Sequence, residues 1–231
     1  MAGSTSTGSP GNVPMLTEAA AALSMNGIYR YQRHVYDFSR RYFLLGRLHM
    51  ISSLSPPSEG HVLEVGCGTA WNLVQAAEKY PGIHLYGFDV STDMLQTAGR
   101  SLDRHRLRGR VRLAHGDATE FDTHRMFGRA AFDRVFISFA LSMIPGWKDV
   151  IAACSKVLAE DGELHIVDFG QCERLPAAFR QLLFAWLAQF SVTPRAGFEE
   201  ELGKFARENG LELAFSRLFR GYSVCAVLRR S

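Results

Sequence analysis

Three carboxylates in the first half of the chain each stand in or just after a short apolar run. Glu64 lies in HVLEV, two residues before Gly66 and four before Gly68. Asp89 ends YGFD, and Asp117 follows VRLAHG. Glycine lacks a Cβ, so the backbone at such a pair can adopt positive φ and let a ligand lie against the main chain. A helix starting after the glycines would turn its unpaired N–H groups toward the same place. The pattern therefore predicts a strand, a tight turn and a helix around a nucleotide-like ligand.

The residue type at position 71 discriminates between two kinds of nucleotide. A dinucleotide-binding turn has the pattern GxGxxG, whose third glycine allows close packing and whose helix N-terminus holds a pyrophosphate. Trp71 occupies that third position here, and the carboxylate of Glu64 would repel a pyrophosphate. These residues favour a cationic cofactor without phosphate. Asp89 could then accept both hydroxyls of a ribose and Asp117 the amine of an adenine, although both could instead be solvated strand ends.

Five segments carry a resemblance to a known family: VLEVGCGTA, YGFDVS, HGDA, FDRVFISFALSMIP and LAEDGELHIVDFG. Over roughly residues 60–170 the chain resembles the class I S-adenosylmethionine-dependent methyltransferases, with Ala70 where many members carry a third glycine. The resemblance implies a Rossmann-like α/β fold with a mostly parallel seven-stranded sheet, helices on both faces and an N-terminal helical arm. It implies S-adenosylmethionine as cofactor and S-adenosylhomocysteine as product. The expected cofactor-binding residues are Glu64, Gly66, Cys67 as a small filler residue, Gly68, Asp89, Val90, Met94, Asp117, Ala118 and Ser138.

Composition limits the remaining possibilities. With 231 residues and 47% apolar composition, the chain can bury the core of one ordinary α/β domain. No apolar run is long enough to span a membrane and no secretory leader is present, so we expect a cytoplasmic protein. The four cysteines lack metal-ligand spacing, so no metal is expected. A net charge of +3 does not indicate a nucleic-acid partner, and nothing indicates an oligomeric state.

The chain divides into three predicted parts: a disordered tail at 1–14, a helical arm at 15–58 and the methyltransferase domain at 59–231. Between Asn26 and Leu54, apolar residues recur at steps of three and four, which predicts one amphipathic helix. Its other face is basic. That face is either solvated or covers the cofactor site and binds anionic groups. The arginines of this face are Arg30, Arg33, Arg40, Arg41 and Arg47, and the tyrosines nearby are Tyr29, Tyr31, Tyr36 and Tyr42.

The stretch YRYQRHVYDFSRRYFLLGR, together with CGTAWNL, SFALSMIP and WLAQFSVTPR, resembles a narrower branch, the bacterial diacylglycerylhomoserine N-methyltransferases. Trp71 departs from that branch's pattern. The resemblance implies three successive methyl transfers to the amine of a lipid head group, giving a betaine lipid. Tyrosine faces attract ammonium groups, and arginines bind carboxylates. The expected substrate-binding residues are Tyr29, Tyr36, Arg40 and Arg47, and the candidate proton acceptors are Tyr31, His34 and Asp37.

Three alternatives stay open. Phosphatidylethanolamine N-methylation uses the same donor, and methylation of a quinone or small metabolite would not require the basic arm. A third possibility is a membrane-associated binding protein that has lost activity. Peripheral contact with the anionic inner membrane is expected through the arm, the arginines of residues 100–112, or the apolar stretch 176–190.

Further elements follow from the hydrophobic pattern. Helices are predicted over 91–110, 147–159 and 197–209, a fifth strand in DGELHIVDF after a turn at Asp161 and Gly162, and an antiparallel hairpin over 211–230. Residues 176–190 predict either a buried core helix or an interfacial one, with Phe179, Leu183, Phe184, Trp186 and Phe190 as its large apolar side chains.

Overall fold

The computed structural model describes residues 43–230, and the chain divides into two compact units, Met1–Leu44 and Leu45–Ser231. The second unit includes residues 45–58, which the sequence analysis assigned to the arm. The predicted tail and most of the arm lie outside the described residues. So do the predicted site residues Tyr29, Tyr31, His34, Tyr36, Asp37 and Arg40.

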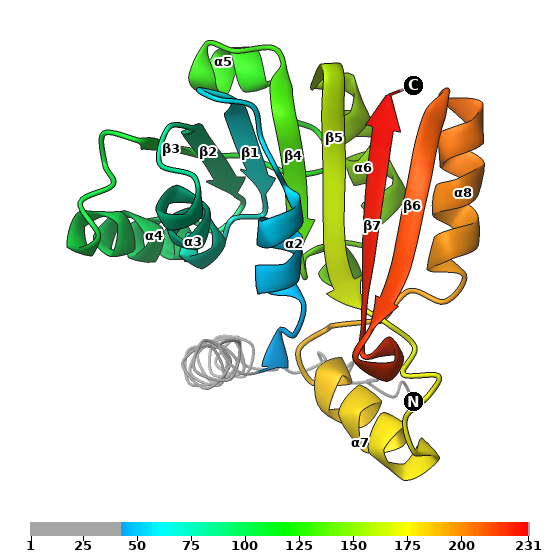
Figure 1. Cartoon of the computed structure of the whole chain (residues 1–231). Coiled ribbons are helices and arrows are strands. Elements are labelled where there is room, and N and C mark those ends of the chain that lie inside the picture. The colour runs from blue at the N-terminus through cyan, green and yellow to red at the C-terminus, as the bar shows by residue number, and fades with distance from the viewer. Residues whose placement is uncertain (1–42, 231) are drawn as a thin grey trace, which may run out of the picture. The chain divides into compact units, whose positions relative to one another are not determined.

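A seven-stranded sheet forms the centre of the second unit, in the order β3-β2-β1-β4-β5-β7-β6 (Figure 1). The first five strands of this order are parallel, and β7 is antiparallel to both of its neighbours. The predicted mostly parallel sheet and the edge hairpin are therefore confirmed. The strands are β1 (His61–Val65), β2 (His84–Asp89), β3 (Val111–His115), β4 (Phe132–Ser138), β5 (Leu158–Phe169), β6 (Leu211–Leu218) and β7 (Ser223–Arg230).

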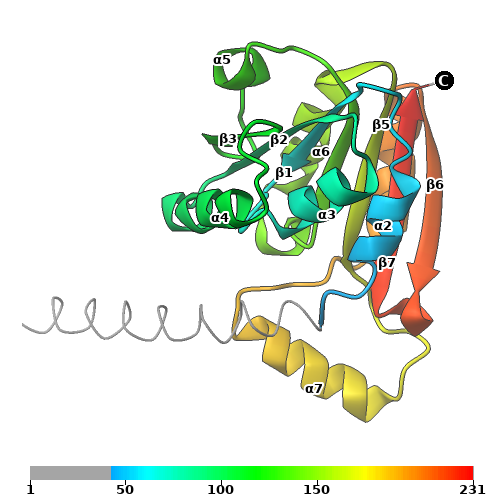
Figure 2. The same ribbon diagram turned by 60° about the vertical axis from the view of Figure 1, so that its left-hand side comes forward.

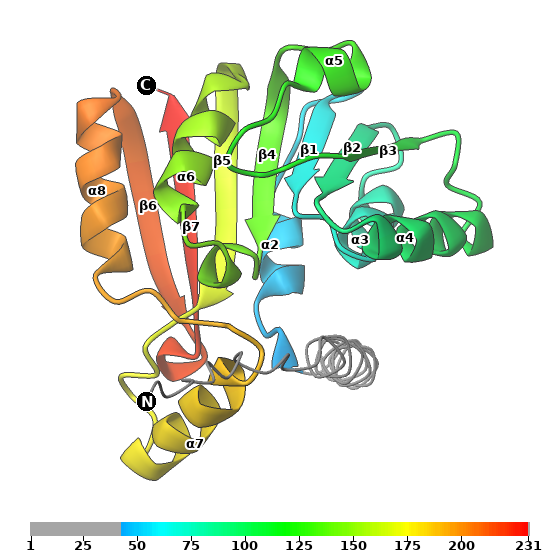
Figure 3. The same ribbon diagram turned by 180° about the vertical axis from the view of Figure 1, so that it is seen from behind.

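Helices cover both faces of the sheet, as predicted. α2 and α3 lie over one face, and α6 and α8 lie over the other (Figures 1 and 3). For α3 and α6 this division follows from right-handed crossovers, which run from β1 toward one edge and from β4 toward the other. The helices are α2 (Arg47–Ser53), α3 (Trp71–Lys79), α4 (Thr92–Arg104), α5 (Thr123–Phe127), α6 (Trp147–Lys156), α7 (Ala177–Ala188) and α8 (Phe198–Glu208), with 3₁₀ turns η1 (Leu141–Met143) and η2 (Phe219–Gly221).

The core lies on both sides of the central strands. Because helices cover both faces, β1 and β4 read as nearly continuous apolar runs rather than alternating ones. Phe88, Phe132 and Phe136 are fully buried, and the rings of Tyr86 and Phe132 pack edge-to-face with centroids 5.2 Å apart. At the edge, β6 alternates between half-buried and exposed residues, as an edge strand with one solvated face does.

The prediction of one helix from Asn26 to Leu54 is wrong at its C-terminal end. α2 begins only at Arg47, because Gly46 has φ of 112°, a value that interrupts a right-handed helix. A Cβ on Gly46 would lie 3.0 Å from Cγ2 of Val167, so the chain passes close to β5 at this point. The glycine thus separates α2 from the sequence before it.

Two predicted boundaries also shift. α4 ends at Arg104 instead of residue 110, and Arg106 adopts φ of 56° in the turn that follows. α6 ends at Lys156, because β5 already begins at Leu158. The predicted turn at Asp161 and Gly162 is an irregularity within β5: Phe132 pairs with Leu158, whereas Arg134 pairs with Glu163. By contrast, α8 and the β6–β7 hairpin lie where the sequence predicted them.

The buried-core alternative for residues 176–190 is wrong. Within the part of the chain that the structure describes, α7 buries only Leu183 and Leu187. Phe179 is 46% exposed and Leu182 is 72% exposed. α7 is therefore a surface helix with large apolar side chains in solvent.

Candidate active site

The carboxyl ends of β1 and β4 lie side by side at the point where the strand order reverses. From β1 the chain crosses to β2 on one side, and from β4 it crosses to β5 on the other. In open α/β sheets, ligands bind outside the carboxyl ends of the strands at such a switch point. The loops after β1, β2 and β4 carry most of the predicted cofactor-binding residues. The fold thus brings residues 66–70, 89–90 and 138–140 to one edge of the sheet.

The loop after β1 has an unusual backbone. Gly66, Gly68 and Ala70 have φ of 72°, 52° and 60°. The N–H groups of Gly66 and Cys67 both donate to the carbonyl of Phe88, at 3.0 and 2.9 Å, which fixes the loop against the end of β2. Since only glycine adopts positive φ without strain, alanine at position 70 costs roughly 1 kcal/mol, more than the small change that the sequence suggested.

Gly87 makes the close approach of this loop possible. A Cβ on Gly87 would lie 2.6 Å from Cδ1 of Leu73 and 2.9 Å from Cβ of Cys67. The absence of a side chain in the middle of β2 therefore lets α3 and the glycine loop pack directly on the strand. In the dinucleotide fold the third glycine serves this packing, and Trp71 stands there in this chain. Gly87 was not among the predicted site residues, although a glycine inside a strand is a signal of close approach.

Glu64 is held beneath the loop by Asn72. Nδ2 of Asn72 donates to Oε1 of Glu64 at 2.6 Å, and both residues are buried. A buried carboxylate needs hydrogen-bond donors to offset the loss of hydration, so Asn72 helps to fix its position. Asn72 was not predicted as a site residue, because its partner is visible only in the folded chain.

Asp89 combines structural bonds with spare acceptor capacity. Its Oδ2 accepts the N–H of Gly68 at 2.8 Å and its Oδ1 accepts the N–H of Ser91 at 2.9 Å. A carboxylate has about four lone-pair positions, so it can accept further bonds from two hydroxyls. The next side chain, Val90, is 65% exposed and offers an apolar surface beside it. These features fit the ribose and purine of the predicted cofactor, while the individual contacts stay predictions.

Cys67 lies inside the same loop and is buried. Burial and the nearby negative charges of Glu64 and Asp89 raise the pKa of its thiol well above the ordinary value. A thiol that stays protonated is a poor nucleophile. This agrees with the prediction of a small filler residue.

Asp117 lies close to the end of β2, because the N–H of Gly116 donates to the carbonyl of Asp89 at 3.2 Å. Its Oδ1 accepts the hydroxyl and the N–H of Thr119, at 2.7 and 2.8 Å, and these bonds lower the pKa of the carboxyl. The neighbouring Ala118 is buried. An ionised carboxylate at this edge is compatible with the predicted contact to an adenine amine, which stays a prediction.

The loop after β4 begins with two uncommon features. Ser138 is buried, and within residues 43–230 its Oγ has no hydrogen-bond partner. Phe139 has φ of 53°, and its ring packs edge-to-face on Phe169 with centroids 4.7 Å apart. Strained backbone and unpaired buried polar atoms concentrate at functional sites. Both features fit a ligand-binding position for Ser138.

Asp168 and Arg195 fasten this loop from the other side. Asp168 accepts the N–H groups of Ser142 and Phe169, at 3.0 and 2.7 Å, and burial raises the pKa of its carboxyl. The guanidinium of Arg195 donates to the carbonyls of Leu141 and Ile144, at 2.8 and 2.7 Å. Neither Asp168 nor Arg195 was among the predicted site residues. The position of Asp168 near the end of an apolar strand was the available signal.

Arg47 does not lie on a solvated face as the helical pattern suggested. It is 7% exposed, and its guanidinium carbon lies 3.9 Å from the ring centroid of Trp71. Such a stack is worth about 0.5–2 kcal/mol and joins α2 to the first residue of α3. The unusual tryptophan therefore has a structural partner. A substrate contact for Arg47 stays a prediction.

Several of the arginines of residues 100–112 form ion pairs or hydrogen bonds with other residues of the chain. Arg108 pairs with Asp103 at 2.7 Å, Arg110 donates to the carbonyls of Ala77 and Tyr80, and Arg112 donates to the carbonyl of Phe127. These bonds favour a structural role over a membrane contact.

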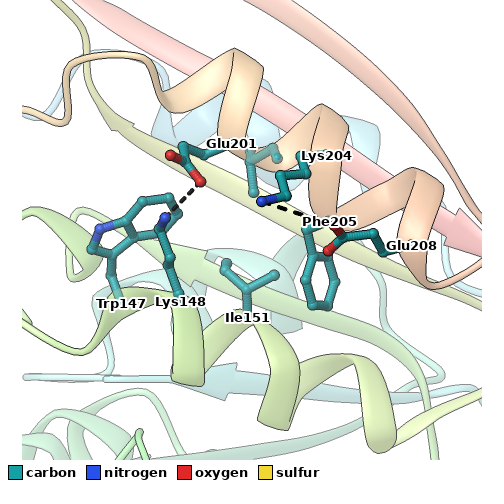
Figure 4. A pocket seen from close by; sticks show the side chains of 8 residues that line it. Trp147, Lys148, Ile151, Glu201, Lys204, Phe205 and Glu208 are labelled. Atoms are coloured by element: carbon teal, nitrogen blue, oxygen red, sulfur yellow. Dashed lines mark hydrogen bonds and ion pairs between the residues drawn. The ribbon is translucent and has the colours of Figure 1, made fainter.

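A separate pocket lies between α6 and α8, on the face of the sheet away from α3 (Figure 4). Lys148 and Glu201 form an ion pair at 2.5 Å across it, and Trp147, Ile151 and Phe205 supply apolar walls. The described residues contain no cluster of His, Cys, Asp and Glu that could hold a metal. Among them, no helix has the length and apolar character needed to cross a membrane.

Comparison with known proteins agrees with this geometry. Residues 62–162 match the family described as "Methyltransferase domain". Demethylmenaquinone methyltransferase of Listeria welshimeri is 36% identical over 112 residues, which are 48% of this chain and 45% of the relative. The protein of the same name from Geobacillus sp. is 27% identical over 161 residues, 69% of this chain and 62% of the relative. The chain thus spans about half the length of the curated relatives it matches.

Solved structures show the same fold. A SAM-dependent methyltransferase from Aquifex aeolicus superposes with a TM-score of 0.62 at 15% identity, covering 83% of this chain and 93% of its own. Phosphoethanolamine N-methyltransferase 2 of Haemonchus contortus, in complex with S-adenosyl-L-methionine, gives 0.59 at 22% identity, covering 74% and 38%. The predicted fold, methyltransferase class and cofactor are confirmed at this level. Residues 62–162 therefore match a methyltransferase domain, and the chain around them has the fold of the solved S-adenosylmethionine-dependent methyltransferase.

Proposed function

We propose that this chain transfers a methyl group from S-adenosylmethionine to an amphiphilic acceptor. The observation that supports cofactor binding is the convergence of the Gly66–Ala70 loop, Asp89 and Ser138 at the switch point of the sheet. When bound, the cofactor supplies a methyl group already activated on a sulfonium. The chain's own task is then to orient the acceptor and to exclude water.

A quinone-like acceptor is the candidate that the comparisons support better. The relatives named demethylmenaquinone methyltransferase reach 36% identity, and one of them aligns with 69% of this chain. The chain spans about half the length of the proteins that carry this name. The proposal for this chain is therefore methylation of a quinone or a similar small aromatic molecule.

The amine of diacylglycerylhomoserine is the second candidate, and a specific feature of the sequence favours it. Residues 29–47 combine tyrosines with arginines in the stretch YRYQRHVYDFSRRYFLLGR. Tyrosine faces would stabilise the growing ammonium charge, while Arg40 and Arg47 would bind the carboxylate. Tyr31, His34 or Asp37 would take the proton that the amine loses before each transfer. Phosphatidylethanolamine is the related lipid that lacks this carboxylate.

One assay separates these acceptors. Purified protein is incubated with S-adenosylmethionine and, in separate mixed micelles, with demethylmenaquinone, diacylglycerylhomoserine or phosphatidylethanolamine, and product masses are read. A gain of one methyl on the quinone alone establishes the first candidate. Mono-, di- and trimethylated homoserine lipid without quinone product establishes the second.

Two further outcomes overturn the proposal. Methylation of none of these three acceptors, with S-adenosylmethionine still bound, would contradict an amphiphilic acceptor of these classes. Undetectable binding of S-adenosylmethionine would instead favour a binding protein that has lost activity. The variant Asp89→Ala serves as the inactive control, because the substitution removes the predicted ribose contact together with the acceptors of the Gly68 and Ser91 N–H groups.

A further inference from the structure

Exposed apolar and basic side chains occur on α7, on η2 and on the segment before α7 that is hydrogen-bonded to η2. We call this set the tip patch and define it as Phe179 and Leu182 of α7, Phe219 and Arg220 of η2, and the flanking Arg174 and Arg180. Phe179, Leu182 and Phe219 are 46%, 72% and 52% exposed, and the three arginines are exposed as well. Large apolar side chains in solvent call for an explanation when they cluster.

The backbone joins the two halves of the tip patch. The N–H of Cys172 donates to the carbonyl of Gly221 at 2.8 Å, and the N–H of Arg174 donates to the carbonyl of Arg220 at 3.2 Å. The segment that leads into α7 is thereby fastened to the end of the β6–β7 hairpin. α7 and η2 lie at the same end of the sheet as the carboxyl ends of β4 and β5 (Figures 1 and 2). The tip patch therefore lies at the end of the domain where the cofactor site is.

The hairpin tip holds its side chains in a strained backbone. Phe219 and Arg220 have φ of 50° and 60°, in a position where hairpins usually carry asparagine or glycine. Each such residue costs on the order of 1 kcal/mol. The side chain of Phe219 does not recover this cost by burial, because half of it is in solvent. An aromatic residue that is both strained and exposed points to a contact made outside the chain.

The charges of the tip patch specify what that contact is. Within residues 43–230, Arg174, Arg180 and Arg220 form no ion pair. The acid beside them, Glu173, pairs with Arg217 at 3.4 Å. Unpaired arginines around exposed phenylalanine and leucine are typical of a surface that enters the interface of an anionic bilayer. A protein partner with an apolar groove would not require three unpaired positive charges around it.

We propose that the tip patch docks the domain on an anionic lipid surface, with Phe179, Leu182 and Phe219 entering the interface and the three arginines on the phosphates. This places the cofactor end of the sheet toward the membrane. The proposal goes beyond the choice of acceptor and does not depend on it, since docking requires neither S-adenosylmethionine nor an acceptor lipid.

The test is co-sedimentation of the full chain with phosphatidylcholine vesicles, with and without phosphatidylglycerol, in the absence of cofactor. Binding is expected only with the anionic lipid and should weaken as salt is raised. Phe219→Asn is the most informative variant. It relieves the strained turn, so thermal stability should be equal or higher, while vesicle affinity should fall about tenfold because one inserted aromatic ring is lost. Arg180→Glu should lower affinity at least fivefold.

Two control variants carry comparable changes at exposed positions outside the tip patch. Arg106→Glu reverses an exposed charge after α4, and Leu48→Ser removes an apolar side chain on α2 that is 59% exposed. Both should bind as the unaltered chain does. Equal loss in Arg106→Glu and Arg180→Glu, or unchanged binding by Phe219→Asn, would overturn the proposal. So would a dimer that Phe219→Asn converts to a monomer, because a second copy of the chain would then cover the patch.

Discussion

Replacing Gly87 by alanine tests whether close packing under the glycine loop supports cofactor binding. The added Cβ would lie 2.6 Å from Cδ1 of Leu73 and 2.9 Å from Cβ of Cys67. Carbon atoms in contact lie about 3.5–4.0 Å apart, so one side must move by roughly 1 Å. The tip of Leu73 can rotate. Cys67 cannot move without its backbone, because its N–H is bonded to the carbonyl of Phe88. We therefore expect the loop itself to shift.

The magnitude follows from two opposing effects. Overpacking of a buried site costs about 1–3 kcal/mol, and alanine in a strand recovers about 0.5–1 kcal/mol relative to glycine. The net loss is centred on about 1 kcal/mol and reaches at most about 2.5 kcal/mol, which lowers the unfolding midpoint of a chain of this size by roughly 2–4 °C and at most about 10 °C. Affinity for S-adenosylmethionine should fall at least tenfold, because the displaced loop carries Gly66 and Gly68.

The assays are thermal unfolding and calorimetric titration with S-adenosylmethionine. Gly109→Ala is the matched control, since a Cβ there meets no atom within 4 Å. Adding Leu73→Ala to Gly87→Ala removes one of the two clashes, so the double variant should be less destabilised than the sum of the single ones. If Gly87→Ala unfolds and binds like the unaltered chain, the packing argument is refuted.

Three other changes have defined outcomes. Arg47→Lys keeps the charge but loses the planar stack on Trp71, so the free energy of unfolding in urea should fall by about 1 kcal/mol, and an unchanged value would contradict the stack. Asp168→Asn presents one acceptor oxygen to two N–H groups, among them that of Ser142, and should cost about 1–3 kcal/mol in the same assay. The hydrogen bond from His165, with Arg134 and Arg229 nearby, lowers the pKa of Glu163 to about 2. Its stabilisation is thus complete above the ordinary carboxyl pKa near 4.5 and is lost as pH falls toward 2, so Glu163→Gln should flatten the acid side of the stability curve.

The sequence predicted the parallel core of the sheet well, because buried strands carry a signal in their own residues. The runs VLEV and VFIS are buried on both faces and consist mostly of apolar residues, and glycines mark the turn after the first. Boundaries were less accurate where tertiary contacts decide them. The bulge at Asp161 in β5 depends on pairing with β4, and the break at Gly46 depends on packing against Val167.

The site residues likewise fall into those that were predictable from local sequence and those that depend on tertiary contacts. Glu64, Gly66, Gly68 and Asp89 were predictable because a ligand-binding turn constrains residues that are close together in the sequence. The residues that position them come from other strands or loops, and each is recognisable only by a partner far along the chain. Among these are Gly87, which lies against Cys67, and Asp168, which accepts the N–H of Ser142. The composition of α7 did not determine whether the helix is buried or exposed, since an apolar helix can be either a core helix or an interfacial one.

The central claim is that the carboxyl edge of β1 and β2 holds S-adenosylmethionine. The most direct test is calorimetric titration of S-adenosylmethionine into the unaltered chain and into Asp89→Asn, with Asp103→Asn, an exposed carboxylate on α4, as control. Hydrogen bonds to a charged group contribute about 1.5–3 kcal/mol, so Asp89→Asn should raise Kd roughly 10- to 150-fold while Asp103→Asn leaves it unchanged. Equal affinity of all three proteins, at comparable unfolding midpoints, would contradict the account.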